Sequence, residues 1–297
     1  MQRVAVLLLI LVLAPACGPW RAAAQDAPTI TWPYFHFPPF SVVQAGRHSG
    51  AWAEVNRLLA AGLAEYGHRR VYSPVSRSLL DASRGRLYCF TGLLRSPERE
   101  ELLAYSLPMR LAPPLVLAVR TADKASHVRH GRVSLAELLA RPGASVAVAK
   151  GFHYADMEPI LDSAEAEDPA KVLRLSSEQA TLRQFELLRA GRVDAAIVTA
   201  PQGMYELAGG GADGGAADLA FLPLAEAREY LVGHVACTRA AGGEAVVERI
   251  NGILAEAVVE PGFINLYLPW IPPGLREEFR SRFTSQVVEP ARRYRGE

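Results

Sequence analysis

Apolar and polar positions along the first hundred residues predict short strands separated by helices. Residues 29–32, 70–72 and 87–91 have the composition and length of strands. A helix is predicted after Gly50, because apolar residues recur there at helical spacing. A second helix is expected over residues 75–83. Strands that alternate with helices are typical of a parallel sheet with crossover helices.

A second series of the same kind follows an extended stretch at residues 111–120, whose prolines prevent a helix. Ser176 and Gln179 have the spacing of a capping box at the start of one of its helices, and Gly191 ends that helix. The other strands are expected at residues 145–149, 172–175, 192–198, 221–224 and 230–236. The other helices are expected at residues 134–140, 154–161, 201–207, 246–258 and 264–268, and after Pro272.

The first residues have the pattern of a secretory signal peptide. Arg3 precedes an unbroken apolar run at residues 4–14, and small residues follow before Gln25. The run is too short to span a bilayer and has no polar face, which argues against a cytosolic amphipathic helix. We therefore expect residues 1–25 to be removed and the protein to be periplasmic. A lipid anchor at Cys17 ranks second, because the residue three positions before it is alanine rather than leucine.

Composition and charge narrow the class of function. The whole chain carries 32 Lys and Arg against 31 Asp and Glu. Removal of residues 1–25 takes away two arginines and no acid, which leaves 30 against 31 and a net charge of −1. This balance argues against a nucleic-acid-binding protein, which needs a dense basic face. The glycine-rich tract at residues 209–218 lacks the Lys-Ser/Thr of a phosphate loop, and scattered histidines favour no metal site. We expect no cofactor.

Two cysteines, Cys89 and Cys237, remain after the leader is removed. In an oxidising compartment an isolated pair can form one disulfide. Two separate buried thiols are the alternative, since free cysteine is often buried.

Several motifs occur in the order found in one family. They are P-P-F at residues 38–40, G-L-L-R-S-P-E-R-E followed by Y-S-L-P, then V-A-V-A-K-G, and L-L-R-A-G-R-V-D-A-A-I-V. Together they resemble the family 3 extracellular solute-binding proteins, which are periplasmic receptors for ABC transporters of polar amino acids. The resemblance extends from about Ile30 to Trp270, and this chain would be a divergent member.

The resemblance implies an α/β fold of the two-lobed, type II periplasmic-binding-protein kind. Each lobe would be a mixed β-sheet flanked by helices, and a two-strand hinge would join the lobes. Lobe 1 would be discontinuous, comprising residues 26–116 and 224–297, and lobe 2 would comprise residues 117–223. In such a fold the strands that carry Cys89 and Cys237 are neighbours in lobe 1, which makes a disulfide between them feasible.

The resemblance also assigns Ser96 and Arg99 to the α-carboxylate of a ligand. The residues themselves agree, since Ser96 is a good N-cap and Pro97 suits the first helical position. Free N–H groups, a hydroxyl and a guanidinium would then converge on one carboxylate. The alternative is a solvent-facing Arg99 that pairs with Glu98 or Glu100 on a surface helix.

The remaining expected ligand contacts come from both lobes. By the same resemblance Phe37 stacks on the ligand, whereas Phe35 and Phe40 are expected in the core. The turn formed by Gly151, Phe152 and His153 would face the ligand from lobe 2.

Thr199 occupies a position where the family usually has an aspartate that binds the α-ammonium of the ligand. A hydroxyl cannot supply the charge that such a buried ammonium needs. We therefore expect a ligand without an essential α-ammonium. Asp194 is expected to have a structural role in a turn.

The resulting hypothesis is a monomeric protein without catalytic activity that captures a small carboxylate ligand. It would deliver the ligand to an ABC transporter permease, or act as a sensor. The alternative is a dehydratase-like periplasmic enzyme on the same fold. Its candidate acid–base groups would be Glu158, His153 and His36, and facing carboxylates in the cleft would favour it.

Overall fold

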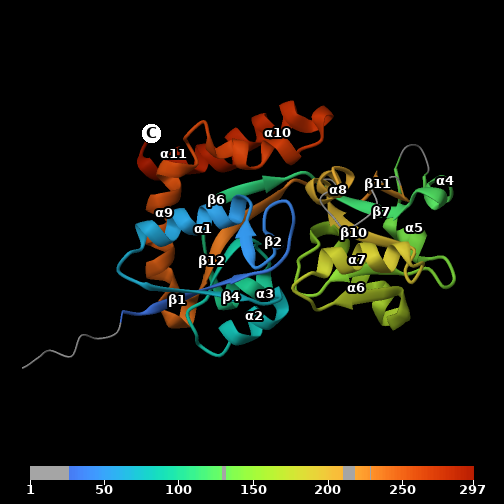
Figure 1. Cartoon of the computed structure of the whole chain (residues 1–297), viewed down its shortest axis with the longest axis horizontal. Helices are drawn as coiled ribbons and strands as arrows, with labels where there is room; N and C mark the ends of the chain where they lie inside the picture. Colours follow the sequence, from blue (N-terminus) through green and yellow to red (C-terminus); the bar gives the residue numbers. More distant parts are fainter. Residues whose placement is uncertain (1–26, 129–131, 210–217, 228) are drawn as a thin grey trace, which may run out of the picture.

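The computed structural model describes residues 27–128, 132–209, 218–227 and 229–297. The expected signal peptide, Cys17 and most of the glycine-rich tract lie outside these described residues. Figure 1 shows two lobes beside each other, with the C-terminal helices packed along the first. In the part of the chain that the structure describes, no helix has the length and apolarity needed to cross a bilayer.

Most strands of lobe 1 form a mixed sheet, and β2 (Val42–Gln44) and β3 (Arg47–Ser49) form a separate hairpin. β1 (Thr29–Tyr34) pairs in parallel with β4 (Gly67–Tyr72). A bridge from Thr31 to Tyr88 links β1 to β5 (Cys89–Leu94). β12 (Leu231–Thr238) lies between β5 and β6 (Leu103–Ala112) and runs antiparallel to both. The last of the described strands therefore lies between two strands from the first part of lobe 1.

Helices cover the faces of the lobe 1 sheet. α1 (Ala51–Gly62) buries Trp52, Val55 and Leu59, as its apolar spacing predicts. Gly50 precedes it with φ +95°, and a Cβ there would lie 2.6 Å from the carbonyl oxygen of Pro39. The other helices of this lobe are α2 (Val75–Ala82), α3 (Pro97–Leu102), α9 (Gly243–Ala257), α10 (Arg276–Phe283) and α11 (Glu289–Arg295).

Lobe 2 is built on a five-stranded sheet in the order β11-β7-β10-β8-β9. The pairs β10–β8 and β8–β9 are parallel, whereas β7 is antiparallel to both of its neighbours. The strands are β7 (Leu115–Arg120), β8 (Val146–Ala149), β9 (Val172–Leu175), β10 (Ala195–Thr199) and β11 (Leu219–Pro223). The helices include α4 (Lys124–His127), α5 (Leu135–Leu139), α6 (Glu158–Glu167), α7 (Ala180–Arg189) and α8 (Ala200–Leu207).

Two chain segments connect the lobes. Pro113 and Pro114 separate β6 of lobe 1 from β7 of lobe 2, and the chain returns between β11 and β12. Each lobe has a mixed sheet with helices around it, so the expected two-lobed α/β fold class is confirmed. The boundaries placed at 116/117 and 223/224 stay a prediction.

Local differences from the sequence expectations have identifiable reasons. The capping box expected at Ser176 does not form, since α7 has no side-chain cap and the hydroxyl of Ser176 lies 3.0 Å from that of Ser76 in lobe 1. A capping box forms instead at Thr199, whose side chain and Gln202 bond reciprocally at the start of α8. The extended stretch expected at residues 111–120 contains parts of two strands. β6 begins at Leu103 and ends at Ala112, and β7 begins at Leu115.

The expected disulfide is confirmed. Cys89 on β5 and Cys237 on β12 face each other in the strand register and are bonded, across 148 positions of sequence. The bond attaches the returning segment to the first part of lobe 1.

Candidate ligand-binding site

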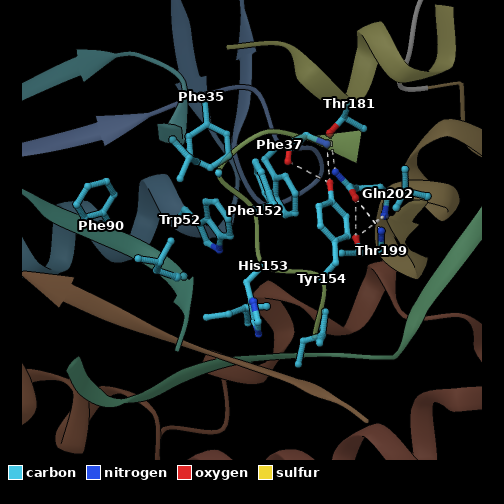
Figure 2. A pocket seen from close by; sticks show the side chains of 18 of the residues that line it. Phe35, Phe37, Trp52, Phe90, Phe152, His153, Tyr154, Thr181, Thr199 and Gln202 are labelled. Carbon is cyan, nitrogen blue, oxygen red and sulfur yellow. Dashed lines mark hydrogen bonds between the residues drawn. The ribbon is translucent and has the colours of Figure 1, made fainter. Parts of the chain in front are cut away.

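A cavity lies between the two lobes, and side chains of both line it (Figure 2). Its free space is about 60 Å³. A buried water needs roughly 10–15 Å³ measured in this way, so the cavity has room for a few waters. Larger ligands therefore require the lining rings to move or the lobes to separate.

Stacked aromatic rings form the centre of the lining. The ring of Phe37 lies between Trp52, at 5.1 Å and 11°, and Phe152, at 5.2 Å and 22°. Phe35 packs edge-on against Phe152 at 5.5 Å and 87°. Because Phe152 belongs to lobe 2 and the others to lobe 1, the stack joins the lobes (Figure 2). Such offset and edge-on ring pairs are favourable beyond the area they bury.

The three phenylalanines of the first loop differ in their position relative to the cavity. Phe37 is buried and lines the cavity, where it was expected to stack on a ligand. Phe40 is fully buried in the lobe 1 core, in contact with Tyr267. Phe35, which was expected in the core, packs against that core and also lines the cavity.

Arg99 lines the cavity and connects the two lobes. Its guanidinium donates to the carbonyl oxygen of Leu94 at 3.0 Å and to that of Gly151, in lobe 2, at 2.6 Å. It forms no ion pair within 4 Å with a carboxylate of the described residues; Glu100 pairs with Arg95, and Glu158 and Glu98 act on Arg99 only at longer range. Burial lowers the pKa of Arg99 from its usual value. The alternative of a solvent-facing Arg99 with an acidic partner is therefore wrong.

Ser96 is buried beside Arg99 but does not line the cavity. It occupies the N-cap position of α3, as the sequence predicts, and Pro97 is the first residue of that helix. Its hydroxyl does not cap the helix. Its carbonyl oxygen accepts from the N–H groups of Arg99 and Glu100, so Ser96 positions the turn that presents Arg99.

Arg110 is a second arginine in the cavity lining, and the sequence analysis missed it. Its side chain comes from β6 and is only 3% exposed. Its Nε donates to the carbonyl oxygen of Gly92 at 2.9 Å. The guanidinium carbon lies 5.5 Å from the ring centre of Trp52 and 6.0 Å from that of Phe40. The available signal was a single charge inside the otherwise apolar run MRLAPPLVLAV.

The lobe 2 wall consists of neutral hydrogen-bonding side chains. Thr199 donates from its backbone N–H and its hydroxyl to Oε1 of Gln202, at 2.8 and 3.1 Å. Gln202 in turn donates to the hydroxyl of Thr181 at 2.7 Å, and Figure 2 shows the three together. Gln184 donates to two backbone carbonyls of the sheet. Thr199 therefore lines the cavity as expected, but its hydroxyl is occupied by helix capping.

Gly151, Phe152 and His153 form the turn after β8, and all three line the cavity. Gly151 has φ +84°, and a Cβ there would lie 2.8 Å from the backbone nitrogen of Ser76 in lobe 1. Glycine therefore allows the lobes to approach closely at this point. Burial, and secondarily the charge of Arg99, lower the pKa of His153, so the imidazole is neutral at neutral pH.

The acid–base candidates of the enzyme alternative do not converge in the cavity. Burial raises the pKa of Glu158, and its Oε2 is buried without a hydrogen-bond partner, but this residue does not line the cavity. His36 also lies outside the lining, where its Nδ1 accepts from the backbone of Val43. Among the described residues that line the cavity there is no Asp or Glu. The described residues also contain no group of three or more potential metal ligands.

Comparison with known proteins identifies the fold. No protein-family model and no curated protein matches the sequence. An ancestral arginine-binding protein bound to arginine matches with a TM-score of 0.64 and 18% identity, covering 83% of this chain and 100% of that one. The substrate-binding protein of an amino acid ABC transporter matches with a TM-score of 0.60 and 17% identity, covering 82% and 98%. An ancestral amino acid-binding protein, a precursor of cyclohexadienyl dehydratase, matches with a TM-score of 0.61 and 18% identity, covering 82% and 96%.

Proposed function

We propose that this protein is a periplasmic solute-binding protein that captures a small carboxylate-bearing ligand between its lobes. One observation carries the proposal. Arg99 contacts both lobes from the cavity lining, and its hydrogen-bond acceptors among the described residues are backbone carbonyls. Two bonds use two of the five N–H groups of a guanidinium. A ligand carboxylate would both accept from the remaining groups and offset the partly buried positive charge.

The ligand we infer does not depend on an α-ammonium. The neighbours in the comparison bind amino acids, including arginine. In this protein the described cavity lining is positively charged on the lobe 1 side and neutral on the lobe 2 side. An ammonium there would meet like charge and no carboxylate, which is unfavourable at low dielectric. Carboxylates without an amino group should therefore bind at least as well as standard amino acids.

Delivery to an ABC transporter permease, or a role as a sensor, is part of the same proposal. The shared fold with a transporter's substrate-binding protein supports delivery, and the disulfide between Cys89 and Cys237 is typical of proteins in oxidising compartments. We propose that residues 1–25 direct export and that the mature protein acts as a monomer without a cofactor.

Catalysis is the second candidate, favoured by the neighbour described as a precursor of cyclohexadienyl dehydratase. Against it stands the lack of a carboxylate among the described lining residues, because a dehydratase needs a positioned acid or base. His153 is an ionisable group of the lining whose pKa is lowered and whose side chain is suited to proton transfer.

Native mass spectrometry of protein purified from its own periplasm tests the proposal directly. We expect a co-purified small acid, which calorimetry should then show to bind when it is added back. Incubation of that acid with the protein should return it unchanged. Release of a different product would contradict the binding role and favour catalysis, and failure of every carboxylate in a panel to bind would contradict carboxylate capture.

A further inference from the structure

We propose that Arg110 and the indole N–H of Trp52 form a second oxyanion subsite, and that the ligand is a small dicarboxylate. This inference rests on the proposed binding function. It adds a contact that neither the family resemblance nor the motif order indicates. The first subsite is Arg99, on α3, and the second lies on β6 and α1, deeper in lobe 1.

The first argument is charge. Arg110 is 3% exposed and pairs with no carboxylate among the described residues, and its Nη1 is buried without a hydrogen-bond partner. Burial lowers its pKa to about 10, so the guanidinium is still charged at neutral pH. Its one bond, to the carbonyl oxygen of Gly92, and the faces of two rings do not neutralise that charge. A buried charge without a counterion is costly, and an anionic ligand would remove this cost.

The second argument is a neighbouring donor. Trp52 is 5% exposed, and its Nε1 is also buried without a partner. Buried indole N–H groups usually find an acceptor. Trp52 lies within cation–π distance of Arg110, and both residues line the cavity. Two unpartnered donors at one place in the same lining match an oxyanion, which accepts several hydrogen bonds.

The third argument is that the backbone makes room for both side chains. Gly92 has φ +76°, and a Cβ there would lie 2.6 Å from the indole ring of Trp52. A Cβ on Gly233, which faces Arg110 in the strand register, would lie 2.4 Å from Nε of Arg110. Any other residue at either glycine would displace one of the two donors, so the subsite depends on both glycines.

The chemical class of the ligand follows from the whole lining. Two guanidiniums at different places in one cavity can each bind one carboxylate of a ligand. The rings of Phe35, Phe37 and Phe152 can pack against an apolar segment that joins the two carboxylates. A monocarboxylate would occupy only one subsite and leave the other cation uncompensated. A dicarboxylate with a hydrocarbon body satisfies both.

Calorimetry on the full mature protein tests this inference with pairs of acids. Each pair consists of a linear monocarboxylate and the dicarboxylate of the same carbon number, in a series of increasing length. We expect the best dicarboxylate to bind about ten- to a hundredfold more tightly than its matched monocarboxylate, as hydrogen bonds to a charged group would give. Trp52→Phe and Arg110→Met should each shrink this ratio, and Trp32→Phe, which changes a tryptophan of the lobe 1 core outside the lining, should preserve it.

A measurement on the unmodified protein avoids dependence on variants that fold poorly. The indole N–H resonance of Trp52, assigned with Trp52→Phe, should shift further when the dicarboxylate binds than when the matched monocarboxylate binds, because only the dicarboxylate fills both subsites at once. The second subsite would be overturned if the two acids bind equally, or if the indole resonance does not shift when the dicarboxylate binds. Either result would leave the proposed carboxylate binding by Arg99 unaffected. If no acid of either kind binds, the proposed function itself fails.

Discussion

The two walls of the cavity differ in chemistry. The lobe 1 wall holds both guanidiniums, Arg99 and Arg110, whereas the lobe 2 wall is a neutral network around Thr199 and Gln202. Uncharged donors and acceptors accommodate many ligands, but an uncompensated cation selects for charge. In the proposed function, lobe 1 would therefore fix the kind of ligand, and lobe 2 would complete its enclosure.

The lobes also differ in how they are held together. Lobe 1 consists of two segments of chain that a disulfide joins, and lobe 2 is one continuous segment. Contacts between the lobes include ring stacking through Phe152 and the packing of Tyr205 against Trp270 at 5.4 Å. They also include a small number of hydrogen bonds: Arg99 to Gly151, Ser76 to Ser176, and the N–H of His36 to the carbonyl oxygen of Glu178. Such an interface suits opening and closing.

Removing the disulfide should have the largest effect, and it should act on lobe 1. In the loop-entropy model a closed loop of this length contributes about 4–5 kcal/mol to the free energy of unfolding, as an upper value. Urea unfolding of the Cys89→Ala, Cys237→Ala double variant, followed by tryptophan fluorescence, should show this loss. The described tryptophans Trp32, Trp52 and Trp270 all belong to lobe 1 segments. Reductant should destabilise the wild type and leave the double variant unchanged. Equal stability of the two proteins would show that lobe 1 does not need the bond.

Replacing Arg99 tests whether the charged lobe 1 wall provides the affinity for a carboxylate. Arg99→Ala should weaken binding of a carboxylate ligand by about 2–5 kcal/mol, as truncation of one side of a buried charged pair does. Arg99→Lys should restore part of the loss, because lysine lacks the planar fork. Arg95→Ala is the matched control, since Arg95 lies on the same turn outside the lining and pairs with Glu100. Calorimetry that gives similar affinities for Arg99→Ala and the wild type would remove the main support for carboxylate capture.

Acid should destabilise lobe 1 through His234. Burial, opposed by a bond of its Nδ1 to the carbonyl oxygen of Ser106 and reinforced by Arg95 and Arg110, lowers its pKa to about 4. The unfolded chain takes up a proton near pH 6.5, and the folded state resists it until about pH 4. Stability should therefore fall as the pH decreases from 6.5 towards 4, by at most about 3 kcal/mol.

Urea unfolding at a series of pH values checks this expectation. His48, also in lobe 1, has a pKa of about 4 for the same main reason, so His234→Asn should flatten the pH dependence only in part. A pH profile that His234→Asn leaves unaltered would show that other groups govern acid sensitivity.

Placing a carboxylate side chain in the lobe 2 wall of the cavity should have the smallest effect. It would test whether the lack of a carboxylate there disfavours ligands that carry an amino group. Aspartate at position 199 can still cap α8, so Thr199→Asp should fold. It should favour an α-amino acid over its deaminated analogue by about 1 kcal/mol relative to the wild type, because the cost of desolvating two buried charges offsets most of their attraction. Thr199→Asn keeps the cap without the charge and serves as the control. If calorimetry finds the same change with asparagine, the charge is not responsible.

Much of the fold could be predicted because it depends on local pattern. The helix that begins at Ala51 was predicted from apolar spacing, and the strand at residues 172–175 was placed correctly. The strand from Leu103 was missed because its partner is β12, more than a hundred residues later in the chain. Pairing at that distance leaves no signal in the local sequence.

The candidate site could be predicted only where a motif marked it. Arg99 was found through its motif, although its bond to Gly151 in the other lobe was not foreseen. Arg110 belongs to no motif. Its proposed binding role depends on the glycines and aromatic rings that the fold places around it. Ser176 shows the opposite error, because a correct capping pattern is overridden by a contact with the other lobe.

The position of β12 has a consequence for the order in which the protein is completed. β5 and β6 do not pair with each other but with β12, which is synthesised after the whole of lobe 2. During synthesis from the N-terminus, lobe 2 has all its strands while β5 and β6 still expose unpaired edges, which are prone to wrong association. Lobe 1 begins first and finishes last, so its nascent form is the stage at which a holding chaperone would be most useful.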